Sequence, residues 1–107
     1  MLYNLDKLTE EHLRQHPGRP FSGHVGNIRW DVWAVSNVFC VQPTDNRISV
    51  RSFTKLDNAR KYMRLATKWL SMPKTHPQWE CTHMQIKQLL KEELVMVSTE
   101  EVQDGTS

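Results

Sequence analysis

The chain has 107 residues, of which 38% are hydrophobic and 24% charged, and this balance fits one globular domain. It has no run of about 18 apolar residues, so we expect no membrane-spanning helix. The net charge of +2 argues against a protein mimic of nucleic acid, which would need a large negative excess.

The N-terminus and the cysteines predict an intracellular, cytoplasmic protein. Residues 1–11 have no basic stretch followed by an apolar block, so no secretion signal is expected. The two cysteines, Cys40 and Cys81, are fewer than the disulfide framework of a small secreted domain usually needs. We expect each to be a buried, reduced thiol.

A short helix is the first predicted element. Thr9 is a good N-cap, and the acids at 10–11 suit the positive end of the helix dipole. Residues 17–18, Pro-Gly, should end the helix, and residues 4–7 could add an earlier turn. Residues 19–26 are rich in Pro and Gly, so this segment could be either a loop or an irregular edge strand.

Three strands are predicted next, because apolar residues alternate with polar ones and turn residues separate the runs. The predicted strands are residues 27–35, 38–41 and 47–53, with turns at 36–37 and 43–46. Such short connections favour an antiparallel meander.

Two helices complete the predicted domain. Residues 54–57 fit a capping-box variant, and Pro73 should end the helix that follows. Its apolar face is expected to consist of Leu56, Ala59, Met63, Ala66 and Leu70.

The last helix should begin at residues 75–78, with Thr75 as its cap and Gln78 three positions on. Its predicted apolar stripe is Trp79, Ile86, Leu90 and Leu94, with Val97 as a further candidate. Residues 95–98 could instead form a short strand.

These elements predict an α+β fold in the order α-β-β-β-α-α, with a three-stranded antiparallel sheet and helices packed on one face. Residues 1–98 would form the single domain. Residues 99–107 are polar and acidic and would form a flexible C-terminal tail.

Alternation along the strands predicts which face of the sheet stays open. Ile28, Trp30, Val32, Ile48 and Val50 should face the helices. The opposite face would then display Arg29, Trp33, Arg47 and Arg51, and Phe39 could join them. Arginines beside exposed rings suit nucleic acid, although Trp33 could instead be core beneath the first helix.

Charge is concentrated in the middle of the chain. Residues 47–74 hold eight basic residues and one acid, Asp57, for a net charge of +7. The charged residues of the segment 92–107 are all acidic. Arg60, Lys61, Arg64 and Lys68 should form a basic stripe on the long helix. The stripe could bind phosphates or be an ordinary solvated face.

The stretch RISVRSFT at 47–54, followed by Ala59 and Tyr62 on the long helix, joins a strand to a helix. In this it resembles small three-stranded DNA-binding modules, such as plant AP2-type domains and the arm-binding domains of phage integrases. The resemblance covers less than half of the chain and implies DNA binding.

We find no pattern for catalysis, for a metal or for another cofactor. His12 and His16 are spaced i, i+4 but have no obvious third ligand, and no Gly-rich phosphate loop precedes a helix. The sequence therefore predicts a small non-enzymatic binding module, most simply for nucleic acid. The alternative is a protein-binding regulator or inhibitor, such as a phage- or plasmid-type accessory protein acting through a Trp/Arg surface.

Overall fold

The computed structural model describes the backbone of residues 2–45 and 47–106 and the side chains of residues 2–45 and 47–93. The elements in chain order are η1 (Leu5–Lys7), α1 (Glu10–Gln15), β1 (Phe21–Val25), β2 (Ile28–Val35), β3 (Val38–Pro43), β4 (Arg51–Phe53), α2 (Leu56–Leu70) and α3 (Trp79–Thr106). The predicted α+β class with an antiparallel sheet is confirmed. The sheet has four strands in the order β1-β2-β3-β4, so the prediction of three is wrong.

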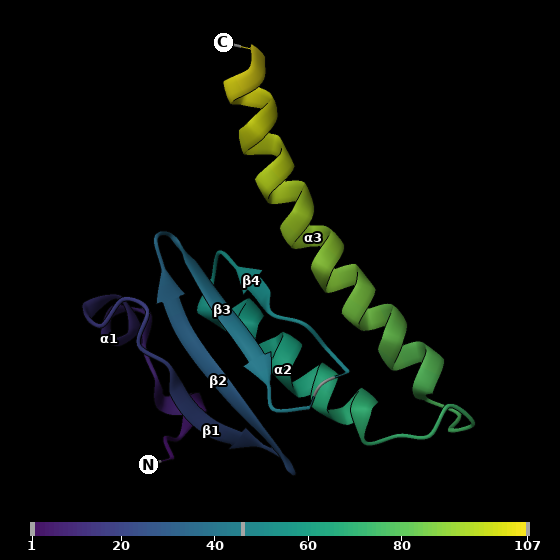
Figure 1. The fold of residues 1–107 in the computed structure, drawn as a ribbon. Coiled ribbons are helices and arrows are strands. Elements are labelled where there is room, and N and C mark those ends of the chain that lie inside the picture. The colour runs from purple at the N-terminus through teal and green to yellow at the C-terminus, as the bar shows by residue number, and fades with distance from the viewer. Residues whose placement is uncertain (1, 46, 107) are drawn as a thin grey trace.

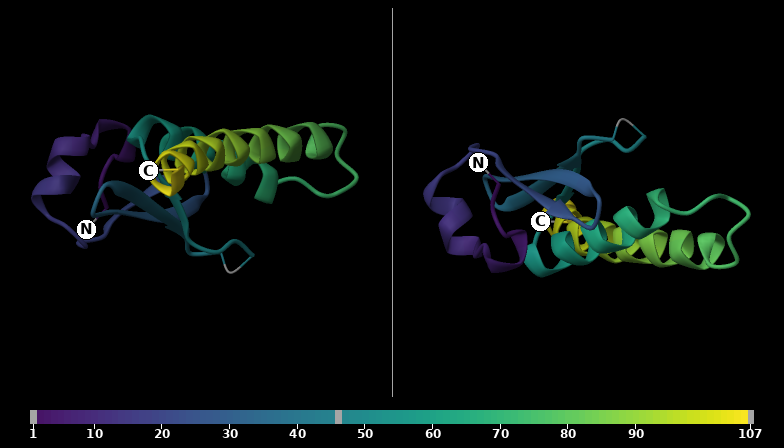
Figure 2. Two further views of the ribbon diagram at one scale, coloured as in Figure 1. Left: turned by 90° about the horizontal axis from the view of Figure 1, so that it is seen from above. Right: turned by 90° about the horizontal axis from the view of Figure 1, so that it is seen from below.

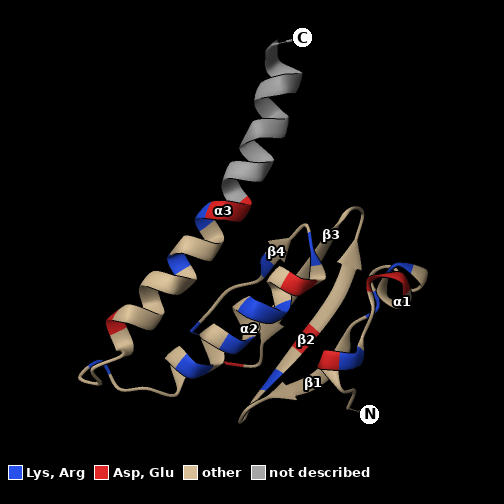
Figure 3. Cartoon of the chain, turned by 180° about the vertical axis from the view of Figure 1, so that it is seen from behind, with Lys and Arg blue, Asp and Glu red and all other residues tan. Residues whose placement is uncertain are grey.

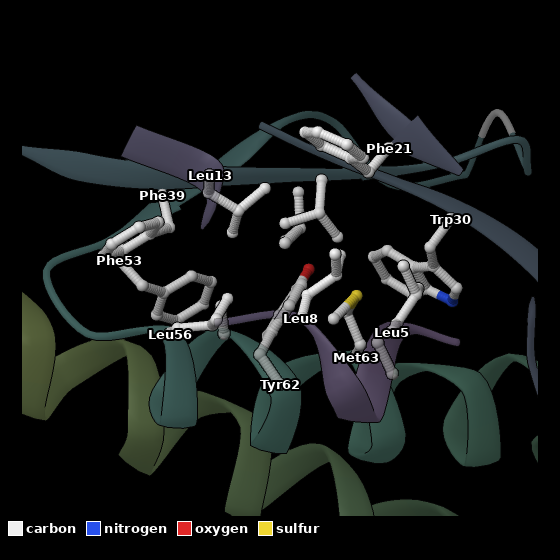
Figure 4. Close-up of a cluster of buried hydrophobic side chains, with 14 of the residues drawn as sticks. Leu5, Leu8, Leu13, Phe21, Trp30, Phe39, Phe53, Leu56, Tyr62 and Met63 are labelled. Carbon is white, nitrogen blue, oxygen red and sulfur yellow. The ribbon is translucent and has the colours of Figure 1, made fainter. Parts of the chain in front are cut away.

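The helices lie on one side of the sheet, and α3 packs beside α2 rather than on the far face (Figures 1 and 2). Burial alternates along β2, where Trp30, Val32 and Ala34 are buried. All five apolar residues predicted for α2 are also buried, and Leu56 and Met63 point into the core between α2 and the sheet (Figure 4). The predicted core face of these two elements is confirmed.

The fourth strand, β1, comes from the segment 19–26, for which the sequence allowed either a loop or an edge strand. It pairs with β2 along its whole length, with Gly23 opposite Trp30. The N-terminal segment lies against it, because the Tyr3 N–H donates to the Ser22 carbonyl oxygen at 2.7 Å. The strand was hard to predict because prolines and glycines usually interrupt sheets.

The strand β4 is shorter than predicted, and its residues face the side of the sheet opposite to the one predicted for them. Only Arg51–Phe53 pairs with β3, and Phe53, opposite Phe39, is buried on the helix side. Phe39 is buried there too, so its expected place on the open face is wrong. Val50 is 41% exposed instead of facing the helices. The predicted parity is therefore wrong by one residue over 50–53, whereas Ile48 packs against the core as predicted.

A fork between Asp45 and Arg47 explains the late start of β4. The Arg47 backbone N–H and Nε donate to Asp45 Oδ1 at 2.9 and 3.0 Å, and Nη2 donates to Oδ2 at 2.6 Å. Arg47 Nη2 also donates to the Leu70 carbonyl oxygen at 3.3 Å, at the end of α2. These bonds lower the pKa of Asp45 from 3.8 to about 2 and raise that of Arg47. The pair therefore stabilises the fold above pH 3.8 and loses its effect as the pH falls towards 2.

The helix starts follow the predicted caps only in part. Thr9 caps α1, since its side chain accepts from the His12 N–H at 3.1 Å. The predicted capping box of α2 is wrong: its N-cap, Lys55, makes no side-chain bond, and the Leu56 N–H donates to Glu10 Oε2 at 3.0 Å. A carboxylate from α1 thus replaces the local cap.

The helix α3 begins at Trp79, a turn later than predicted. Before it, the Gln78 N–H donates to His76 Nδ1 at 3.0 Å. The backbone of residues 95–98 is helical, so the alternative of a strand there is wrong. The predicted places of Leu94 and Val97 concern side chains outside the described residues. The backbone of α3 continues to Thr106, and the flexibility of the segment 99–107 stays a prediction. None of the described helices combines the length and apolarity needed to cross a bilayer.

Candidate nucleic-acid interface

The open face of the sheet keeps two of the predicted site residues, Arg29 and Trp33. Both lie on β2, where Arg29 is exposed and Trp33 is half-buried outside the core cluster. Asp31 shares this face and accepts a hydrogen bond from the Ser22 hydroxyl. The nearby carboxylate offsets the charge of Arg29, so this face is less basic than predicted.

Arg47 and Arg51 lie elsewhere, because the reversed parity of β4 turns Arg51 towards the helices. Arg51 pairs with Val41, which is fully buried on the helix side. Burial raises the pKa of the Tyr62 hydroxyl, and the adjacent Arg51 guanidinium opposes part of that shift. The expected grouping of these two arginines with Arg29 and Trp33 is wrong.

Arg60 does not belong to the basic stripe on α2. Its guanidinium donates to the Leu5 carbonyl oxygen at 3.2 Å and to the Leu8 carbonyl oxygen, and its side chain is only 17% exposed. It therefore holds the N-terminal segment against α2. Its predicted place among solvent-facing cations is wrong.

The other three residues of the stripe line a groove between α2 and α3. Lys61, Arg64 and Lys68 are exposed along α2 (Figure 3), and the groove measures about 470 Å³. Leu65 and Leu89 contribute apolar surface to it. It contains no aromatic ring among the described residues, so it offers cations but no surface on which a base could stack.

A second basic surface lies between the segment before β4, the end of α2 and the start of α3. Two hollows of about 280 and 330 Å³ adjoin there and share Arg47 and Trp69. We call them the aromatic groove, defined by Arg47, Arg51, Trp69, Lys74, Trp79, His83 and Lys87. It brings together two predicted site residues and several that the sequence analysis assigned to helix stripes or passed over.

Three rings in the groove form one cluster, in which one pair is stacked and the other two pairs are tilted. The Trp69 and His83 rings are nearly parallel, with centroids 5.1 Å apart and planes at 16°. Trp79 completes the cluster, 5.4 Å from Trp69 and 5.3 Å from His83. All three side chains are half-buried, and the Lys74 ammonium lies 5.9 Å from the Trp79 ring centroid. The rings form a wall of the groove that solvent still reaches.

The cations of the groove are mostly unneutralised. Arg51, Lys74 and Lys87 form no ion pair with any acid in the described part of the chain, and Arg47 alone is paired, with Asp45. No described acidic residue lines either hollow. The site therefore combines positive charge with aromatic surface, as binding sites for phosphate-bearing ring compounds do.

The sequence analysis missed this cluster because Trp69 and Trp79 lie on different helices. The turn between them brings the end of α2 back to the start of α3. A partial indication was present, since Trp79 and His83 are four positions apart and share one side of a helix. The missing information was the packing of α3 on α2, which periodicity within one helix does not reveal.

The other residues considered for chemistry remain apart. His12 and His16 pack against Phe21, with centroid distances of 5.2 and 6.2 Å. Within residues 2–45 and 47–93, no three metal-ligating side chains gather at one place. Cys40 is buried, but Cys81 is exposed, so the expectation of two buried thiols is wrong for Cys81.

Comparison of the chain with family models, with curated proteins and with solved structures finds no match. The function is therefore argued from the site alone.

Proposed function

We propose that this protein is a small, non-enzymatic module that binds nucleic acid through the aromatic groove. The observation that supports the proposal is the juxtaposition of three cations, Arg51, Lys74 and Lys87, with the half-buried Trp69 and Trp79 rings. None of the three forms an ion pair within the described residues. Cations attract phosphates, and indole rings stack on bases without requiring a particular sequence.

The groove suits this role better than the open sheet face. On the sheet, Arg29 shares its face with Asp31, and Trp33 has no second aromatic ring beside it in the described contacts. In the groove, the cations and rings lie together without a lining acid from the described residues. Arg47 and Arg51 keep their proposed role, while Arg29 and Trp33 lose it.

The double variant Arg51→Ala, Lys87→Ala is expected to weaken binding of a labelled oligonucleotide at least about tenfold near 100 mM salt. Removing two phosphate contacts should also flatten the dependence of log K on log salt by roughly 1.4 to 1.8. Fluorescence anisotropy at several salt concentrations measures both effects, and tryptophan emission should change on binding because Trp69 and Trp79 line the site.

The matched control is Lys61→Ala, Lys68→Ala, which removes the same charge from the other groove between α2 and α3, where no aromatic ring of the described residues lies. It should change the affinity less than about threefold, through the long-range field alone. Equal losses in the two double variants would contradict the groove as the site. No binding by the wild type at about 50 mM salt would contradict nucleic-acid binding altogether.

The variant Asp45→Asn is expected to tighten binding about threefold, because it removes the carboxylate that occupies Arg47. Asparagine can still accept the Arg47 backbone N–H at the position of Oδ1, so the turn should persist. The freed guanidinium can then pair with a phosphate and steepen the salt dependence by roughly one contact. The control is Asp57→Asn, which removes an acid that is 93% exposed on α2 and should leave the affinity unchanged. Weaker binding by Asp45→Asn would mean that Arg47 only holds the turn against the end of α2 and does not contact the ligand.

A second candidate function, protein binding, is favoured by the apolar end of the open sheet face. Val35 is 44% exposed beside its strand partner Val38, and Trp33 lies on the same face. Trp33→Ala should then remove a protein that wild type retains in a pull-down, while oligonucleotide binding is unchanged. If the wild type and Trp33→Ala retain the same proteins, Trp33 is excluded as an anchor residue.

A further inference from the structure

The aromatic groove is concave, and its shape restricts which form of nucleic acid can reach the rings. Proteins that recognise duplex bases directly insert a protruding helix or ribbon into a groove of the duplex. Here Trp69 and Trp79 line hollows of about 280 and 330 Å³ between neighbouring elements. A base must therefore enter the protein, which a base paired and stacked inside a duplex cannot do without being extruded.

The ring cluster can be extended by one more flat ring. Trp69 already stacks on His83 at 16°, whereas Trp79 has the Lys74 ammonium 5.9 Å from its centroid. A mobile lysine can leave an aromatic face at small cost, since an exposed cation–π contact contributes only about 0.5–1 kcal/mol. A base stacked on Trp79 would displace Lys74, which could then pair with a neighbouring phosphate.

One buried polar atom of a ring that lines the groove also lacks a partner. The Trp69 indole Nε1 is buried and has no hydrogen-bond acceptor among the described residues. By contrast, the Trp30 indole Nε1 donates to Thr67 Oγ1 at 2.8 Å in the core. Buried donors are usually satisfied, so a small shift of the ring that lets an oxygen or ring nitrogen of a ligand reach Nε1 would supply the missing acceptor.

From these three observations we infer that the groove takes single-stranded nucleic acid in preference to duplex, with a base stacked on Trp79 and flanking phosphates held by Arg51, Lys74 and Lys87. The inference rests on the proposed function and specifies its ligand. It names single strands of DNA or RNA alike, because stacking and phosphate pairing are common to both.

The test compares four labelled probes on the full chain at about 100 mM salt. They are a single-stranded DNA 12-mer, the RNA strand of the same sequence, the DNA duplex of that sequence, and an abasic DNA strand with the same number of phosphates. We expect the single strand to bind at least about tenfold more tightly than the duplex and than the abasic strand. The abasic strand isolates the phosphate contribution, because it has no ring to stack.

The variant Trp79→Ala should weaken binding of the normal strand about tenfold and leave the abasic strand unchanged, whereas Trp79→Phe should keep most of the affinity. Circular dichroism and thermal unfolding check that both variants fold. The wild-type probe comparison stands by itself if either variant fails to fold.

The outcomes separate the two proposals. Duplex binding as tight as single-strand binding, or abasic binding as tight as normal binding, would overturn the single-strand inference and leave the proposed function in place. Absence of binding to every probe at about 50 mM salt would overturn both.

Discussion

Replacing Glu93 with alanine is expected to lower the free energy of unfolding by about 3 kcal/mol. The side chain is only 5% exposed, and its carboxylate accepts three hydrogen bonds. Oε2 accepts from the Thr54 N–H at 3.3 Å and the Thr54 hydroxyl at 3.0 Å, and Oε1 accepts from Asn58 Nδ2 at 2.8 Å. Alanine would leave three donors of the β4–α2 junction without their acceptor.

The adjacent Glu92 provides the matched control. It is exposed and accepts one bond, from Gln88 Nε2 at 3.3 Å within the same helix, so Glu92→Ala should cost less than about 0.5 kcal/mol. The loss for Glu93→Gln should lie between these two values. The amide keeps one acceptor oxygen but places an NH2 donor where the second carboxylate oxygen accepted a hydrogen bond. Urea unfolding followed by circular dichroism measures all three. A loss for Glu93→Ala as small as that of Glu92→Ala would show that water replaces the carboxylate.

The same carboxylate positions one wall of the proposed binding site. Glu93 fixes α3 to the start of α2, while the contacts of Trp69 with Trp79 and His83 fix the two helices at the other end. The aromatic groove lies along α3, between Glu93 and the ring cluster. A variant that releases the first anchor should therefore weaken oligonucleotide binding through a looser groove, even though Glu93 does not line it.

The helices were largely predictable because their determinants are local. The apolar spacing of α2 and the cap at Thr9 depend on residues within a turn or two of each other. The true cap of α2 is Glu10, far away in the chain, and Thr54 is instead bound by Glu93. No pattern within residues 54–57 could reveal that other elements satisfy this helix start.

The sheet and the site were less predictable because each depends on parity and packing. Asp45 and Arg47 bond to each other in the segment before β4, and the register of β4 places Arg51 on the helix side, opposite Val41. A shift of one residue exchanges the two faces of a strand, so the predicted cluster with Arg29 did not form. The ring pair of Trp69 and Trp79 exists only because α3 folds back on α2.

The strand β1 gives the second large expected effect. Gly23→Ala should lower the free energy of unfolding by about 3 kcal/mol, because a Cβ there would collide with the Tyr3 carbonyl oxygen and lie 2.6 Å from Leu5 Cγ. The N-terminal segment cannot simply retreat. The Tyr3 N–H is bonded to the Ser22 carbonyl oxygen, and Arg60 holds the Leu5 carbonyl oxygen from α2.

Gly18→Ala separates this collision from backbone strain. Gly18 has φ +77° with no atom within 4 Å of a new Cβ, so its variant should cost only about 1 kcal/mol, the penalty of a left-handed conformation. Thermal unfolding of both variants tests the difference. Equal losses would mean that the N-terminal segment yields easily. A much larger loss for Gly23→Ala would show that the close approach of residues 3–5 to β1 requires glycine there, in a segment for which the sequence allowed either a loop or an edge strand.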